Sequence, residues 1–248
     1  MSFEEKTVMI TGGGTGIGQQ MAHHFADHGA NIAIADVENA AATADEIDGP
    51  AFGLKTDVTD PDEVEQFVEQ AVDHFDSIDV LINNAAIYAP LVPKRDRRFD
   101  EIPIDEWRSV LEVNTTGVFI CCQKVLPVMI EQEGGSVINI SSAVMYGGVT
   151  GYPHYVTSKG ALPAMTRALA TEVGDYHVRV NSVAPGLVTS EASNQLDDDY
   201  FDMVASHQCL PRKGTPEDVI DTIEYLASDR SSFITGSTLH PDGGSSFR

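Results

Sequence analysis

Tyr155 and Lys159 stand four residues apart, a spacing with a specific chemical use. On a helix, side chains so spaced share one face with Cβ atoms about 5–6 Å apart. A free phenol has a pKa of about 10, and a fixed ammonium beside it lowers that pKa. A phenol tuned in this way can exchange a proton with an alcohol oxygen. A tyrosine and a lysine at this spacing also occur by chance in many helices, so the surrounding residues must show whether the pair is catalytic.

Ser142 lies thirteen residues before Tyr155 and ends the apolar run 136–141. Such a run is typical of a buried strand. A hydroxyl at the carboxyl end of a strand lies where open α/β sheets bind ligands. Ser142 is therefore a candidate to meet the same substrate as Tyr155.

A glycine-rich segment follows the short apolar run 7–10 and leads into a helical stretch that ends near His28. Strand, glycine turn and helix form the context that a phosphate-binding loop requires. The glycines let the backbone approach a pyrophosphate, and the helix N-terminus supplies N–H donors. The candidate cofactor residues here are Gly12, Thr15, Gly16, Ile17 and Gly18.

Asp36 ends the next apolar run, about twenty residues past the glycines. A carboxylate at this place accepts hydrogen bonds from the adenosine ribose and repels a 2′-phosphate. The interpretation is NAD rather than NADP, and an N-capping role for Asp36 is the alternative.

The chain has 38 acidic and 15 basic residues and a formal net charge of −23. Binding to a nucleic-acid backbone needs a basic surface, so nucleic acid is not an expected partner. Halophiles are one setting in which such charge is used. We predict a salt-adapted protein, with a merely acidic mesophilic protein as the alternative.

No apolar run approaches the ~20 residues of a membrane span, and the N-terminus lacks the pattern of a signal peptide. Three cysteines give neither a disulfide framework nor a zinc spacing. We expect a cytoplasmic protein that binds no metal and no membrane.

Apolar runs and helical segments alternate along the whole chain, which requires a parallel sheet with helices on both faces. We expect one doubly wound α/β domain over residues 1–248. Residues 189–210 are polar and lack a regular pattern, as in a mobile flap over a site. Expected strands lie at 7–10, 31–36, 52–56, 80–86, 136–141, 178–184 and 237–240, and expected helices at 61–75, 105–131, 155–175 and 216–227.

In this order and at these spacings, the motifs resemble the short-chain dehydrogenase/reductase family over essentially the whole chain. The resemblance implies a Rossmann-type sheet of seven parallel strands and, usually, a homotetramer. The matching residues are Thr11 with Gly12, Gly16 and Gly18, then Asp57, Asn83-Asn84-Ala85, Asn114, Ser142, Tyr155 with Lys159, Asn181, and Pro185-Gly186.

The resemblance also implies individual roles. Tyr155 is the general acid and base, Ser142 holds the substrate oxygen, and Lys159 lowers the tyrosine pKa and bonds the nicotinamide ribose. Asn114, a poor residue for a helix interior, positions a water that links Lys159 to solvent. Further cofactor contacts fall on Asp57, Val58, Asn84, Ala85, Pro185, Gly186, Val188 and Thr189.

Two features depart from the family pattern. Ala86 stands where the family has glycine, which predicts a small local adjustment without loss of cofactor binding. The loop 88–103 looks somewhat long and contains Lys94, Arg95, Arg97 and Arg98, which we name the basic loop. These bases either attract an anionic substrate or carrier or pair with acids of this or a neighbouring subunit.

The motifs favour an NAD-dependent oxidoreductase that interconverts a secondary alcohol and a ketone. The alternative is a 3-oxoacyl-carrier-protein or 3-hydroxyacyl reductase, whose phosphopantetheine carrier would meet the basic loop. Asp36 weakens that alternative, because reductive synthesis usually draws on NADPH. A third possibility is a nucleotide-sensing regulator without catalysis, which predicts loss of residues from the Ser142, Tyr155 and Lys159 set.

Overall fold

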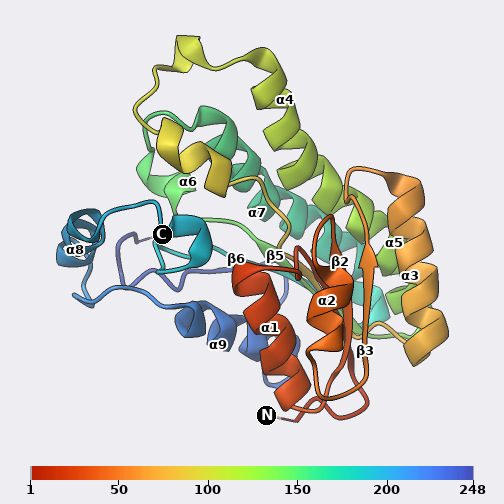
Figure 1. Ribbon diagram of the computed structural model, residues 1–248. Helices are drawn as coiled ribbons and strands as arrows, with labels where there is room; N and C mark the ends of the chain where they lie inside the picture. Colours follow the sequence, from red (N-terminus) through yellow and green to blue (C-terminus); the bar gives the residue numbers. More distant parts are fainter. Residues whose placement is uncertain (1, 248) are drawn as a thin grey trace.

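Seven parallel strands form one sheet within residues 2–247, the part of the chain that this computed structural model describes (Figure 1). The expected doubly wound α/β architecture is confirmed. The strand order is β3-β2-β1-β4-β5-β6-β7. The strands are β1 (Thr7–Thr11), β2 (Asn31–Asp36), β3 (Ala51–Lys55), β4 (Val80–Asn83), β5 (Gly135–Ile140), β6 (Val178–Val183) and β7 (Thr238–Leu239).

Helices follow most strands and return the chain to the start of the next one, as parallel pairing requires. The α-helices of residues 2–247 are α1 (Gly16–Asp27), α2 (Ala40–Asp45), α3 (Pro61–Phe75), α4 (Ile104–Leu111), α5 (Val118–Glu131), α6 (Val144–Gly147), α7 (Pro153–Val173), α8 (Asp198–Ser206) and α9 (Pro216–Ala227).

Two hydrophobic cores lie on the two faces of the sheet. Successive strand residues point to opposite faces. Met9 and Leu81 therefore join one core, with buried residues of α3, α5 and α7, whereas Ile10 and Ile82 join the other, with buried residues of α1 and α9. Figure 1 shows α1 and α9 on one side of the sheet and α3 and α5 on the other.

The strand order reverses between β1 and β4, since the chain runs outward to β3 and then returns across β1 to β4. Ligands of open α/β sheets bind at the carboxyl ends of the strands at such a switch point. Asp36 at the end of β2, Asn84 after β4 and Ser142 after β5 are thereby brought to the same edge of the sheet.

The segment 189–210 is irregular only in part, because α8 forms within it, with the Asp197 carboxylate accepting a hydrogen bond from the Tyr200 N–H at 2.8 Å. Its role as a mobile flap stays a prediction. The helical stretch Ile104–Glu131 is, in residues 2–247, the one helix long and apolar enough to cross a membrane. Half of its most apolar window is buried, and Cys121, Val125 and Met129 pack into the core beside α3, as in a core helix of a soluble protein.

Candidate active site

The glycine turn between β1 and α1 is shaped by close backbone contacts. A Cβ atom on Gly12 would lie 2.8 Å from the Ala85 Cα, and one on Gly18 would lie 1.9 Å from the Gly12 carbonyl oxygen. Gly16, at the first turn of α1, has a left-handed φ of 57° and open space where its Cβ would be. The turn thus leaves room beside N–H donors at a helix N-terminus, which fits a pyrophosphate.

The Asp36 carboxylate lies over this turn. Its Oδ2 accepts the Gly14 N–H at 2.8 Å, and its Oδ1 accepts the Glu38 N–H at 3.0 Å. Asp36 also lines the large cleft at this edge of the sheet. A negative charge therefore lies beside the glycine turn, and the preference for NAD over NADP that it implies stays a prediction.

Asn84 links the end of β4 to the glycine turn through hydrogen bonds. Its Nδ2 donates to the Gly12 carbonyl at 2.9 Å, while its backbone N–H and that of Ala85 donate to the Thr11 hydroxyl at 3.1 and 3.2 Å. Ala86 lines the cleft, and its φ lies outside the left-handed region, so a methyl group at this position brings no backbone strain. The glycine turn and the end of β4 form a cradle that fits a dinucleotide.

Tyr155 and Lys159 lie one turn apart on α7 and both line the same cleft, as does Ser142. Burial raises the pKa of Tyr155 and the nearby Tyr88 adds to this, while a hydrogen bond with Ser142 lowers it. The expected lowering of this pKa by Lys159 stays a prediction. The Lys159 ammonium instead donates to the Ile140 carbonyl at 2.7 Å. Burial lowers the pKa of Lys159 to about 8.

Asn114 is fully buried in a π-helical turn, Glu112–Gly117, that joins α4 to α5. Its Oδ1 accepts the Ile87 N–H at 2.8 Å, and its Nδ2 donates to the Ser158 hydroxyl at 3.1 Å. That hydroxyl donates in turn to the Tyr155 carbonyl at 2.8 Å. Asn114 therefore braces the first turn of α7, and its role in holding a water stays a prediction.

Sixteen of the eighteen residues that the sequence placed in the site line this one cleft, which has a volume of about 1190 Å³. Asn114 and Thr189 do not line it. The Thr189 hydroxyl instead donates to the Gly214 carbonyl at 3.3 Å. The lining residues are Gly12, Thr15, Gly16, Ile17, Gly18, Asp36, Asp57, Val58, Asn84, Ala85, Ser142, Tyr155, Lys159, Pro185, Gly186 and Val188.

Part of the cleft wall lies outside the residues that the sequence placed in the site. Arg95 of the basic loop, Tyr200 of α8, and Ser245 and Ser246 near the C-terminus all line the cleft. Arg95 and Tyr200 belong to segments that the sequence singled out, the basic loop and the expected flap 189–210, whereas no local pattern marks Ser245 and Ser246. His154 is fully buried, with its Nε2 3.1 Å from the Glu106 carboxylate.

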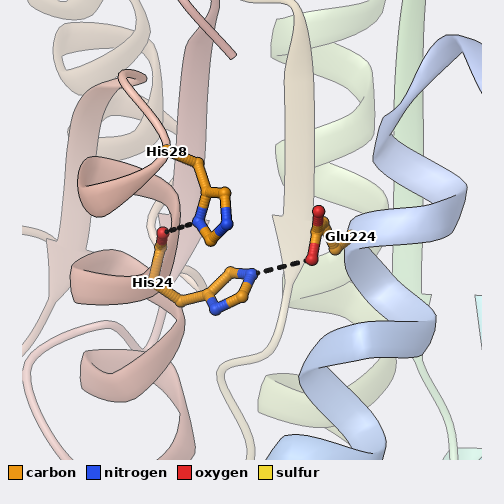
Figure 2. A group of neighbouring side chains, drawn as sticks. All are labelled: His24, His28 and Glu224. Carbon is orange, nitrogen blue, oxygen red and sulfur yellow. Dashed lines mark hydrogen bonds and ion pairs between the residues drawn. The ribbon is translucent and has the colours of Figure 1, made fainter. Parts of the chain in front are cut away.

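A separate group of possible metal ligands joins α1 to α9. Figure 2 shows His24 on α1 and His28, the residue that follows α1, facing Glu224 on α9. The His24 Nε2 lies 3.0 Å from a Glu224 oxygen, and the His28 Nδ1 lies 2.7 Å from the His24 carbonyl oxygen. None of the three lines the cleft. The contacts among them serve to link the two helices.

Comparison with known proteins agrees with this geometry. The family model described as enoyl-(acyl carrier protein) reductase matches residues 12–246. The 3-oxoacyl-[acyl-carrier-protein] reductase FabG of Staphylococcus epidermidis is 35% identical over 245 residues, which cover 96% of this chain and 98% of the relative. FabG of Thermotoga maritima is 35% identical over 249 residues, or 98% and 99% of the two chains.

Two solved structures are similar over the full length. The short-chain type dehydrogenase/reductase of Mycobacterium marinum has a TM-score of 0.87 and 33% identity, covering 100% of this chain and 98% of the other. A Brucella melitensis structure, described as short-chain dehydrogenase/reductase SDR:glucose/ribitol dehydrogenase, has a TM-score of 0.90 and 30% identity, covering both chains completely.

Fold, site and relatives together define an oxidoreductase that works with a nicotinamide cofactor. The chain belongs to the short-chain dehydrogenase/reductase family.

Proposed function

We propose that this protein transfers hydride reversibly between NAD(H) and the carbon of a secondary alcohol or ketone. The observation that carries the proposal is that Ser142, Tyr155 and Lys159 share one cleft with the glycine turn and Asp36. A bound nicotinamide ring would supply or accept the hydride. The protein would cradle the cofactor's phosphates at the glycine turn and its ribose at Asp36.

Proton transfer at the substrate oxygen falls to Tyr155. Its phenol would donate a proton to the oxygen during ketone reduction and accept one during alcohol oxidation. The Ser142 hydroxyl would hold the same oxygen. Lys159, buried with a lowered pKa, would lie within reach of the cofactor ribose and supply positive charge beside the site.

A 3-oxoacyl thioester is the second candidate substrate. The names of the relatives favour it over an unspecified ketone, because the FabG proteins of S. epidermidis and T. maritima are 3-oxoacyl-[acyl-carrier-protein] reductases. The Asp36 carboxylate, which opposes an NADP 2′-phosphate, argues for oxidation with NAD rather than reductive synthesis. The third possibility, a silent nucleotide sensor, is disfavoured by the complete Ser142, Tyr155 and Lys159 set.

The decisive assay measures both directions with NAD(H) and NADP(H), at low and molar salt. The panel contains secondary alcohols, ketones and an acetoacetyl thioester. Turnover of a ketone or alcohol with NAD(H) supports the proposal, and preference for the thioester selects the second candidate. Activity only with NADPH would contradict the role of Asp36, and failure of every compound with both cofactors would refute the function.

We also propose that the protein works in the cytoplasm as a homotetramer, as the family resemblance implies. Sedimentation equilibrium measured at molar salt tests the assembly, and a monomeric mass there would contradict it.

A further inference from the structure

Three of the four bases in the basic loop are neutralised by acids of the same chain. The Lys94 ammonium lies 2.9 Å from Glu106, Arg97 also bonds Glu106, and Arg98 lies 3.0 Å from Asp100. The pairing holds the pKa of Glu106 at about 2, with the Arg97 hydrogen bond as the main cause. Most of the basic loop is therefore a structural ion-pair network.

Arg95 differs from its three neighbours. Within residues 2–247, no carboxylate lies within 4.0 Å of its guanidinium, and its Nη1 is buried without a hydrogen-bond partner. A buried donor without a partner is unfavourable, because it has lost its hydrogen bonds to water and has not replaced them. The side chain lines the cleft, and neither Asp96 nor Glu191, two acids that also line it, pairs with the guanidinium.

Two contacts hold Arg95 in place. Its guanidinium carbon lies 4.6 Å from the centre of the Tyr200 ring, a cation–π contact that leaves the N–H edge available for hydrogen bonds. Its backbone carbonyl packs against Gly151, which has a left-handed φ of 80°, and where a Cβ would lie 2.1 Å from that oxygen. Gly151 thereby seats Arg95 next to the segment that leads into α7.

The position of Arg95 is close to the chemistry. Burial raises the pKa of both Tyr88 and Tyr152, and Arg95 lies near enough to each to lower it. The ring centres of Tyr88 and Tyr152 lie 5.2 and 6.5 Å from that of Tyr155. A small substrate bound at Tyr155 would therefore lie in the same cleft as the guanidinium.

We propose that Arg95 receives an oxyanion of the substrate, so that the preferred substrate is a ketone or secondary alcohol that carries a carboxylate or phosphate near the reacting carbon. This inference rests on the proposed function and narrows its substrate. A chain with a net charge of −23 repels anions from a distance. A fixed guanidinium with free donors offsets that repulsion locally and can bind an oxyanion in bidentate fashion.

The test uses substrates in matched charged and neutral pairs with the intact enzyme. Acetoacetate is compared with methyl acetoacetate and with its N-acetylcysteamine thioester, and dihydroxyacetone phosphate with dihydroxyacetone. For at least one pair, we expect wild-type kcat/KM to be higher with the anionic member. Arg95→Gln should lower kcat/KM for that member about 10- to 100-fold, mainly through KM, and change the neutral members less than about threefold.

Arg95→Lys should retain part of the preference, since it keeps the charge and loses the bidentate geometry. Arg98→Gln is the matched control, because this exposed arginine lies outside the cleft, and it should leave both members unchanged. NADH binding and melting temperature verify that each variant is folded. The substrate pair that responds to Arg95→Gln shows whether the preferred anionic group is a carboxylate or a phosphate.

Preference of the wild type for neutral substrates, or an equal loss for both members in Arg95→Gln, would overturn the inference while the proposed function stands. Failure of the whole panel with both NADH and NADPH would instead refute the proposed function, and the inference with it.

Discussion

The cofactor half of the cleft is held by hydrogen bonds to the backbone, whereas the substrate half is held by side chains from distant loops. In the first half, Asp36 and Asn84 bond the glycine turn directly. In the second, Tyr88 packs on Tyr155, and Arg95 stacks on Tyr200 of α8. The backbone-built half suits a ligand shared by a whole family, and the half built from side chains can vary with the substrate.

This difference predicts how each half responds to mutation. A change in the cofactor half should impair every substrate equally, because all reactions use the same cofactor. A change in the substrate half should alter one class of substrate, or stability, and leave NADH binding intact.

The largest effect is expected from Gly18→Ala. The added Cβ would lie 1.9 Å from the Gly12 carbonyl oxygen, so α1 must move away from the glycine turn. We expect NADH affinity to fall about 30- to 100-fold, measured by fluorescence titration. Gly174→Ala is the control, since no atom lies within 4 Å of its Cβ position. Wild-type NADH binding by Gly18→Ala would contradict the assignment of the turn.

Asp36→Ser should change cofactor choice rather than the affinity for substrate. Removing the carboxylate removes repulsion of a 2′-phosphate, so the ratio of kcat/KM with NADPH to that with NADH should rise about 10- to 100-fold. Glu38→Gln removes a neighbouring charge outside the cleft and should leave this ratio unchanged. An unchanged ratio in Asp36→Ser would show that Asp36 does not select the cofactor.

Glu106→Gln should destabilise the substrate half without touching NADH binding. The carboxylate binds Lys94, Arg97 and the buried His154. Loss of these charge-assisted bonds should lower the melting temperature by about 3–10 °C at neutral pH.

The pH dependence of this effect has a definite sign. The pKa of Glu106 is lowered from its ordinary value of 4.5 to about 2, so the contribution of the carboxylate to stability is complete above the ordinary value and is lost as the pH falls toward 2. The difference in melting temperature between wild type and Glu106→Gln should therefore shrink as the pH falls below about 5. The variant Asp105→Asn, at an exposed position, is the control and should melt at the wild-type temperature. A difference between wild type and Glu106→Gln that persists unchanged at pH 3 would contradict the ion-pair assignment.

Salt should raise stability and activity through both halves of the cleft alike, and this is the smallest of the expected effects at any single site. The acidic residues are spread along the chain, and their repulsion is screened by salt. We expect thermal stability and activity to rise by a modest amount from low to molar KCl. If neither thermal stability nor activity rises, the prediction of salt adaptation is wrong.

The sequence predicted which residues line the cofactor half of the cleft because they form short local patterns, and their contacts with a cofactor stay predictions. Glycines after a strand and an acid at the end of the next strand lie within one βαβ unit, so their spacing alone implies their geometry. The strand ends at Asn84 and Ser142 follow from the parallel alternation.

The rest depended on contacts that spacing does not encode. The Lys159 ammonium turns to the Ile140 carbonyl, and burial dominates the pKa of Tyr155, because both effects depend on how α7 packs against β5. Arg95 and its paired neighbours look alike in sequence and are distinguished only by which acids the fold brings near. The helix α8 begins in a polar segment whose Asp197 cap gave little signal among several acids.

The most direct test concerns the hydroxyl of Tyr155. Tyr155→Phe keeps the ring that packs against Tyr88 and removes the proton that the reaction must move. Steady-state turnover and NADH titration of this variant, compared with wild type, separate chemistry from binding. We predict near-total loss of turnover with NADH affinity largely retained. Turnover equal to that of the wild type would contradict the account.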